Sequence, residues 1–148
     1  MTAGSALDGK HRFRWLNRTS VISSLMDSDM PKDIPSAVRA VLSSGMDMKE
    51  FGSANWALRR ADALEAVSRL YELGVPILGG DVWEMRDGRP SLTRDNWFYR
   101  RLEDEPLVSF LERSTELAKR HIRNYGSNED KEYLFELVPD VKFFSGQS

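Results

Sequence analysis

The sequence predicts an α+β fold in which a small antiparallel sheet packs against about three helices. Three observations predict it. Apolar residues recur at helical spacing in three separate segments, an Asp87-Gly88 dipeptide joins two apolar stretches, and another apolar run follows near the C-terminus. Aspartate followed by glycine favours a two-residue hairpin because both residues tolerate a positive φ. Helices and strands do not alternate strictly along the chain, so an antiparallel sheet is expected rather than a parallel one.

The first two helices are predicted from their apolar stripes and from the residues that would end them. Pro35 suits the first turn of a helix over residues 37–44, and Gly45 would end it. A stronger stripe runs over residues 56–73. Gly74 follows directly, where a left-handed residue commonly closes a helix, so we expect the second helix to end there.

The third helix and the last strand are predicted further along the chain. Asp104 would cap a helix that has Pro106 in its first turn, and Gly126 would end it. The segment 133–138 is ambiguous because it is short enough to be either a helix or a strand. Its Tyr, Leu, Phe and Val residues, closed by Pro139, favour a strand.

A two-residue loop at Asp87-Gly88 sets the pairing of the hairpin, which we expect near residues 76–99. Side chains alternate between the two faces of a strand, so the pairing sorts them into two sets. One set has the composition of a core: Trp83, Met85 and Leu92. The other has the composition of a surface: Glu84, Arg86, Arg89, Ser91 and Thr93, continued by Asp95, Trp97 and Tyr99 unless a bulge changes the register.

Two interpretations of Trp97 and Tyr99 stay open from the sequence. They could lie exposed beside charged residues and form a docking surface, because large aromatic side chains dominate the energetics of interfaces. Alternatively, the third helix covers them. Upstream, Gly79-Gly80 interrupts a β-rich stretch, which predicts a bulge or a close approach of another backbone.

Composition bounds the class of protein. The 148 residues are 41% hydrophobic and 30% charged, which predicts one folded domain, with residues 1–33 as a loosely patterned N-terminal arm. Cysteine is absent, which excludes disulfides and thiolate chemistry and fits a reducing cytosol. The first 25 residues lack the apolar stretch of a secretory signal, and no segment is apolar enough to span a membrane. We therefore expect a cytoplasmic protein.

A net charge of −2 gives no general electrostatic reason to bind nucleic acid. A local exception is the cluster Arg12, Phe13, Arg14 and Trp15, which combines cations with aromatic rings. Such clusters contact phosphates and stack on bases, so a nucleic-acid-binding accessory protein is the alternative function. A docked arm with solvated arginines is the simpler interpretation.

The candidate catalytic groups are few. Asp81, Asp87 and Asp95 could form a carboxylate cluster for a divalent ion or for acid–base chemistry, which makes a hydrolase the third hypothesis. The predicted pairing places Asp81 and Asp95 on opposite faces, and Asp87 serves the turn, so structural roles are favoured. No phosphate-binding loop, G-x-S-x-G motif or metal-ligand spacing occurs, so we predict no catalytic residue, no metal and no cofactor.

Three motifs resemble those of the immunity-protein-forty family of bacterial polymorphic toxin systems. They are LYELGVP at 70–76, ILGGDVW at 77–83 and TRDNW at 93–97, and the resemblance covers about residues 57–125. It implies a cytosolic immunity protein that binds its cognate toxin stoichiometrically and has no catalytic role. The shared motif is expected to be scaffold, and its structural residues are Gly79, Gly80, Asp81, Trp83, Asp87 and Gly88.

The candidate contacts with the toxin are mainly acidic. They are Glu84, Asp95, Trp97, Glu103, Asp104 and Glu105. Acidic patches would complement a basic toxin, such as a nuclease domain, by steering its approach and matching its potential.

Overall fold

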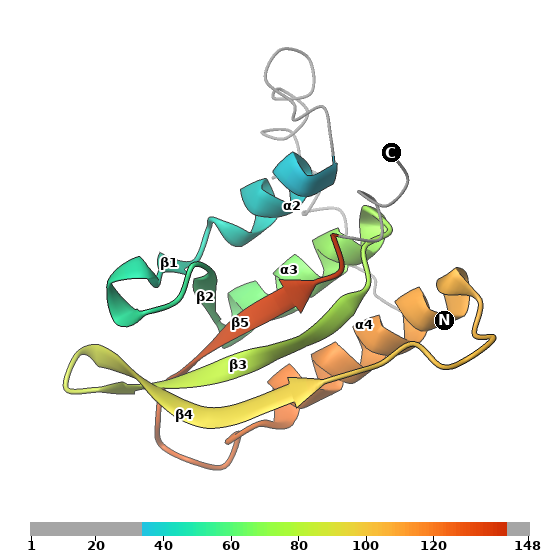
Figure 1. Cartoon of the computed structure of the whole chain (residues 1–148). Coiled ribbons are helices and arrows are strands. Elements are labelled where there is room, and N and C mark those ends of the chain that lie inside the picture. The colour runs from blue at the N-terminus through green and yellow to red at the C-terminus, as the bar shows by residue number, and fades with distance from the viewer. Residues whose placement is uncertain (1–33, 142–148) are drawn as a thin grey trace. The chain divides into compact units, whose positions relative to one another are not determined.

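The computed structural model describes residues 34–141, so the predicted N-terminal arm at 1–33 lies outside the described residues. The described residues from 38 onward form one compact unit. It contains a five-stranded, fully antiparallel sheet of order β1-β2-β5-β3-β4, in which the last strand of the chain is the central one (Figure 1). The α+β class is therefore confirmed.

The elements have the following bounds. The strands are β1 Met46–Asp47, β2 Trp56–Arg59, β3 Ile77–Arg86, β4 Arg89–Phe98 and β5 Tyr133–Pro139. The helices are α2 Ile34–Leu42, the short 3-10 turn η2 Lys49–Phe51, α3 Arg60–Glu72 and α4 Leu107–Asn124. The three predicted helices and the C-terminal strand are present.

Two predicted helix starts are wrong. The segment Trp56–Arg59 is strand β2 rather than the first turn of α3, because it pairs with β5 and buries Ala57 and Leu58 on opposite sides. Asp104 does not cap α4; the N-cap is Pro106, and Asp104 instead has a φ of 68° in the preceding loop.

The end of α3 follows the prediction in detail. Gly74 has a φ of 79° directly after the C-cap Leu73. The Gly74 N–H donates to the Tyr71 carbonyl at 2.9 Å, and the Val75 N–H donates to the Leu70 carbonyl at 2.8 Å. These two hydrogen bonds form a Schellman motif, which satisfies carbonyl groups that the helix itself leaves without a partner.

The hairpin has the predicted loop, with φ values of 50° at Asp87 and 79° at Gly88. Its pairing is also as predicted from Arg86↔Arg89 to Trp83↔Leu92. Beyond that point the register shifts, so the predicted pair Val82 and Thr93 is absent from the ladder. The extra residues lie in β4, where Arg94 has a φ of 71°, and the next pair is Asp81↔Asn96. The shift leaves each side chain of β4 on the face of the sheet that simple alternation assigns to it.

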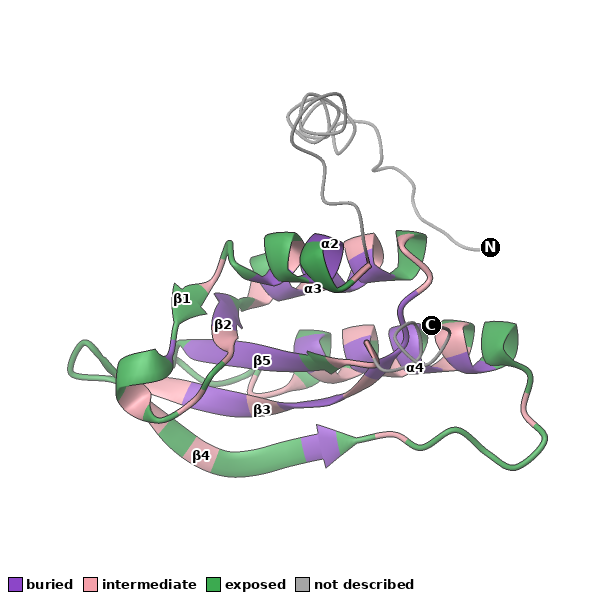
Figure 2. Cartoon of the chain, turned by 45° about the horizontal axis from the view of Figure 1, so that its top comes forward, coloured by how far each residue is buried: buried purple, intermediate pink, exposed green. Residues whose placement is uncertain are grey.

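One face of the sheet, the helix face, packs against α3 and α4 (Figures 1 and 2). Its core side chains are fully buried or nearly so: Leu58, Val82, Phe135 and Leu137 from the strands, and Val67, Leu70, Phe110 and Ile122 from the helices. Burying such side chains contributes about 1.5–3 kcal/mol each relative to exposure. The helix face is the main core.

The opposite face, called here the outer face, has a smaller buried cluster. Met48, Ala57, Trp83 and Leu134 form it, with Phe51 and Met85 packed against it. The segment around η2 thus covers part of the outer face. Strand β4 is largely exposed, as the green of its ribbon shows (Figure 2).

Candidate functional site

The two most specific motifs of the sequence lie side by side. Gly79, Gly80 and Asp81 of β3 pair with Phe98, Trp97 and Asn96 of β4, respectively. The structure therefore brings together segments that are separated by the hairpin in the sequence.

The two glycines of the β3 motif, Gly79 and Gly80, allow the neighbouring backbones and the Trp97 ring to approach closely. The sequence predicted such a close approach of another backbone. A Cβ on Gly80 would lie 2.1 Å from the Glu136 carbonyl oxygen and 2.3 Å from the Trp97 indole. A Cβ on Gly79 would lie 2.2 Å from the Trp97 carbonyl oxygen. These contacts are far shorter than van der Waals distances, so any larger side chain would displace the backbone. The structure thus leaves no room for a side chain at either position.

A groove of about 790 Å³ runs along this end of the β3–β4 pair. Asp81, Asn96, Phe98 and Val138 contribute to its lining from the outer face. The other lining residues are Leu78, Gly79, Gly80, Trp97, Tyr99, Arg100, Arg101, Phe110 and Asp140. The groove is open and has both apolar and charged groups.

Strand register arranges the outer face in three rows across β5, β3 and β4. The first row is apolar and contains Leu134, Trp83 and Leu92. The second is polar and contains Glu136, Asp81 and Asn96. The third contains Val138, Gly79 and Phe98. Leu92 is 45% exposed, Val138 41% and Phe98 66%, so large apolar side chains flank the polar row.

Two carboxylates are neighbours in the polar row. Glu136 is 4% exposed, and its Oε2 has no hydrogen-bond partner among the described residues. Burial raises the pKa of Glu136, with a further increase from Asp81, while the Ser53 hydroxyl and the Trp83 indole lower it. No described residue forms an ion pair with Glu136 or Asp81. The sequence analysis missed Glu136, although alternation along 133–138 would have placed it with Leu134 and Val138.

Trp97 lies on the helix face and is buried, which decides between the two open interpretations for this residue; Tyr99 is half-buried. Its ring centroid lies 4.3 Å from that of His121 on α4, and His121 in turn contacts Tyr125. Burial lowers the pKa of His121, and the nearby Asp95 raises it. The Tyr125 hydroxyl donates to Asp95 Oδ2 at 2.6 Å. Trp97 and Asp95 thus pack against the third helix.

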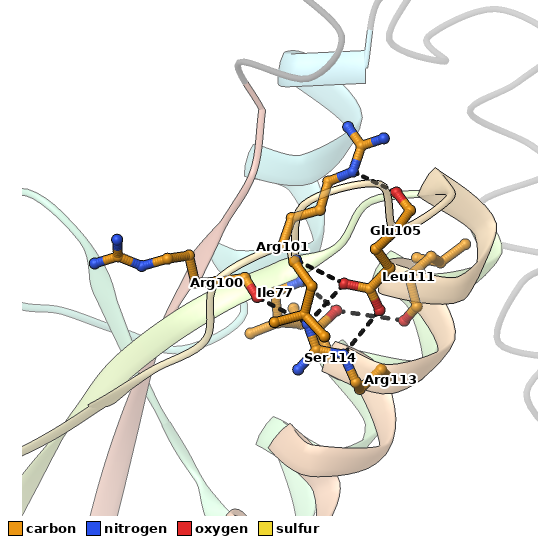
Figure 3. Close-up of polar contacts among 8 residues, drawn as sticks. Ile77, Arg100, Arg101, Glu105, Leu111, Arg113 and Ser114 are labelled. Carbon is orange, nitrogen blue, oxygen red and sulfur yellow. Dashed lines mark hydrogen bonds and ion pairs between the residues drawn. The ribbon is translucent and has the colours of Figure 1, made fainter.

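Glu105 fixes the loop that joins β4 to α4 (Figure 3). Its carboxylate accepts two hydrogen bonds from Arg113, both at 2.8 Å, and one from the Leu102 N–H at 2.9 Å. The Arg101 Nε also donates to the Glu105 carbonyl oxygen at 2.7 Å. Hydrogen bonding to Arg113 and Leu102 lowers the pKa of Glu105 to about 2. This side chain is held within the fold.

The remaining candidate contacts lie apart from one another. Glu103 and Asp104 are exposed on the same loop as Glu105. Glu84 lies on the hairpin, where it forms ion pairs with Arg86 at 3.3 Å and Lys131 at 3.7 Å. The six candidates therefore do not gather in a single site.

The structure also bears on the alternative of a carboxylate or metal site. Asp81 is on the outer face and Asp95 contacts α4, so they do not form one carboxylate site. In the described range 34–141, no three His, Cys, Asp or Glu side chains are grouped so as to hold a metal ion. The basic-aromatic cluster at residues 12–15 lies outside the described residues.

A family model described as immunity protein 40 matches residues 47–139. The chain belongs to the immunity protein 40 family. The match begins at the second residue of β1 and ends with the last residue of β5, so it includes strands β2 to β5 and the helices α3 and α4. No curated protein matches the chain. Among the described helices, none is long and apolar enough to cross a membrane.

Proposed function

We propose that this protein is a cytoplasmic immunity protein that neutralises a cognate bacterial toxin by direct stoichiometric binding, without catalysis. The observation that carries the proposal is the immunity protein 40 match over residues 47–139. The exposed apolar side chains of the outer face support it, because Phe98, Val138 and Leu92 share that face. Large apolar side chains that stay exposed together with polar residues on one face are a feature of protein interaction sites.

The proposed toxin is basic, such as a nuclease domain. Glu103 and Asp104 are exposed on a loop that Glu105 holds in place, and Asp95 is exposed beside Tyr125. Exposed acids at the rim of an interface increase the association rate of a basic partner and its dependence on salt. In this proposal Trp97 and Glu105 support the binding surface from within, and Glu84 supports the hairpin through its ion pairs with Arg86 and Lys131.

The experiment is co-expression with the toxin encoded by the neighbouring gene. We expect survival of cells that produce both proteins, and co-elution of the chain with a catalytically inactive form of the toxin at a 1:1 ratio. Cells that produce the toxin with an unrelated protein serve as the control. Death of the co-expressing cells, or separate elution of the two purified proteins, would reject the proposed function.

A further inference from the structure

The sheet ends in a long edge strand, β4. Among the described residues, the strand order gives the ten residues of β4 a neighbouring strand on one side, β3 (Figure 1). Half of the backbone N–H and C=O groups of an edge strand point away from the sheet, where they can pair with a strand of another chain. Proteins commonly block such edges with proline, bulges or charged side chains. The part of β4 that is not blocked therefore shows where a partner strand can join.

Hydrogen bonding identifies which groups of β4 point outward. The Tyr99 N–H donates to the Leu78 carbonyl at 2.7 Å, so the backbone of Tyr99 is directed to β3. The direction alternates along an antiparallel pair, so the N–H and C=O of Phe98 point to the free edge, and those of Asn96 do the same. Trp97, between them, points its backbone groups to β3. No described strand or loop pairs with the outward groups of Asn96 and Phe98.

Both sides of this open stretch are blocked. Pro90 has no N–H to donate, and the bulge at Arg94, with a φ of 71°, interrupts the strand. Toward α4, the Arg100 carbonyl already accepts a hydrogen bond from Arg113 at 2.7 Å. The open stretch therefore lies between the bulge and Arg100, at residues 96–98.

We propose that the toxin adds an extended segment to β4 at Asn96 and Phe98, so that its backbone continues the sheet of this protein. The inference rests on the proposed function and names the contact through which the toxin binds. In this mode of recognition, main-chain hydrogen bonds supply affinity and side-chain contacts supply specificity. The Asn96 and Phe98 side chains lie on the outer face, so a toxin side chain on the same face would meet the exposed Phe98 ring.

Charge favours a toxin segment over a second copy of this chain. Arg94 and Arg100 stand at the two ends of the open stretch, both exposed and without an ion pair among the described residues. Two copies paired in antiparallel register, with Asn96 opposite Phe98, would bring Arg94 of one copy to the end where the other has Arg100. Like charges at such positions repel, whereas an acidic residue would pair with the arginine. The segment that fits is extended, apolar beside Phe98 and acidic beside the arginines.

The test is amide hydrogen exchange in the full, isotope-labelled chain, followed by NMR with and without the inactive toxin. We expect the Asn96 and Phe98 amides to exchange at least about tenfold more slowly in the complex. Leu92 is the internal control. Its N–H also points outward by the same alternation, but Pro90 and the Arg94 bulge isolate it from the open stretch. Its exchange rate should stay unchanged.

A pair of variants separates the backbone contribution from that of the side chain. Asn96→Pro removes the outward N–H, whereas Asn96→Ala keeps it and removes the amide side chain. We expect the proline variant to bind the toxin about tenfold or more weakly in calorimetry, and the alanine variant to bind like the wild type. Thermal unfolding checks that the proline variant folds. If it does not fold, the exchange rates of the wild-type chain decide.

Each outcome separates this contact from the wider function. If the toxin binds and the Asn96 and Phe98 amides exchange as in the free chain, the inference is wrong and the proposed function stands. Slower exchange that extends equally to Leu92 would mean that the toxin covers the face without adding a strand, which also overturns the inference. Slower exchange in the concentrated chain alone would assign the edge to a second copy, against the inference. If the toxin does not bind, the proposed function fails as well.

Discussion

The two faces of the sheet differ in what their side chains are used for. The helix face buries Phe135 and Val82 completely beneath α3 and α4. On the outer face, Phe98 stays 66% exposed and Glu136 is buried beside another acid. Since removing apolar surface from water is the main stabilising term in folding, the helix face supplies most of the stability. In the proposed function, the outer face is the binding surface.

The largest effect should follow a change on the helix face. Phe135→Ala removes a fully buried ring at the centre of β5 and leaves a cavity, so we expect a loss of about 3–5 kcal/mol in the free energy of unfolding. Urea denaturation followed by tryptophan fluorescence measures it. A loss below about 1 kcal/mol would mean that the helix face is not the main core, and the comparison of the two faces would fail.

The second prediction concerns Gly80, which lies where the motif strands approach most closely. Gly80→Ala places a Cβ against the Glu136 backbone and the Trp97 ring, and such overpacking costs about 1–3 kcal/mol. Gly88→Asn is the control, because a Cβ there meets nothing within 4 Å and asparagine tolerates its φ of 79°. If both variants unfold at the same denaturant concentration as the wild type, the motif is not scaffold.

These local features could be read from the sequence because neighbouring residues determine them. The Asp87-Gly88 loop, the Gly74 helix end and the close approach at Gly79-Gly80 each depend on the φ values or the size of a few residues. Strand β2 was missed because Ala57 and Leu58 satisfy a helical stripe equally well. Only pairing with β5, which lies far away in sequence, makes them a strand.

The candidate site was harder to predict for the same reason. Burial of Trp97 depends on where α4 lies, and the pairing of Phe98 with Gly79 follows from the register beyond the Arg94 bulge. The row of Glu136, Asp81 and Asn96 exists only after three strands have assembled. A pattern within one strand cannot reveal that its acid will meet an acid on the next.

Phe98 provides the third prediction, as the counterpart of Phe135. Its ring is mostly exposed, so Phe98→Ala should change the free energy of unfolding by no more than about 0.5 kcal/mol. If the outer face is the binding surface, the same change should weaken binding of the inactive toxin by about tenfold or more, which is typical of a large aromatic contact. Calorimetry on the purified variant measures it. Unchanged affinity would place the binding surface elsewhere, on the Glu103 loop for instance.

The smallest predicted effect concerns Glu105, an acid that the fold itself uses. Because Arg113 lowers its pKa to about 2, the ionised form stabilises the folded state above the unfolded pKa near 4.5, and this contribution disappears as the pH falls through 2. Glu105→Gln should therefore melt slightly below the wild type at pH 7, and the difference should shrink as the pH falls from about 5 to 2. The Arg113 side chain is 33% exposed, so solvent screening keeps the effect small. Toxin binding should be nearly unchanged, since the side chain is turned inward to Arg113. A large loss of binding with no change in acid sensitivity would instead make Glu105 a direct contact, and would extend the binding surface from the outer face to the loop before α4.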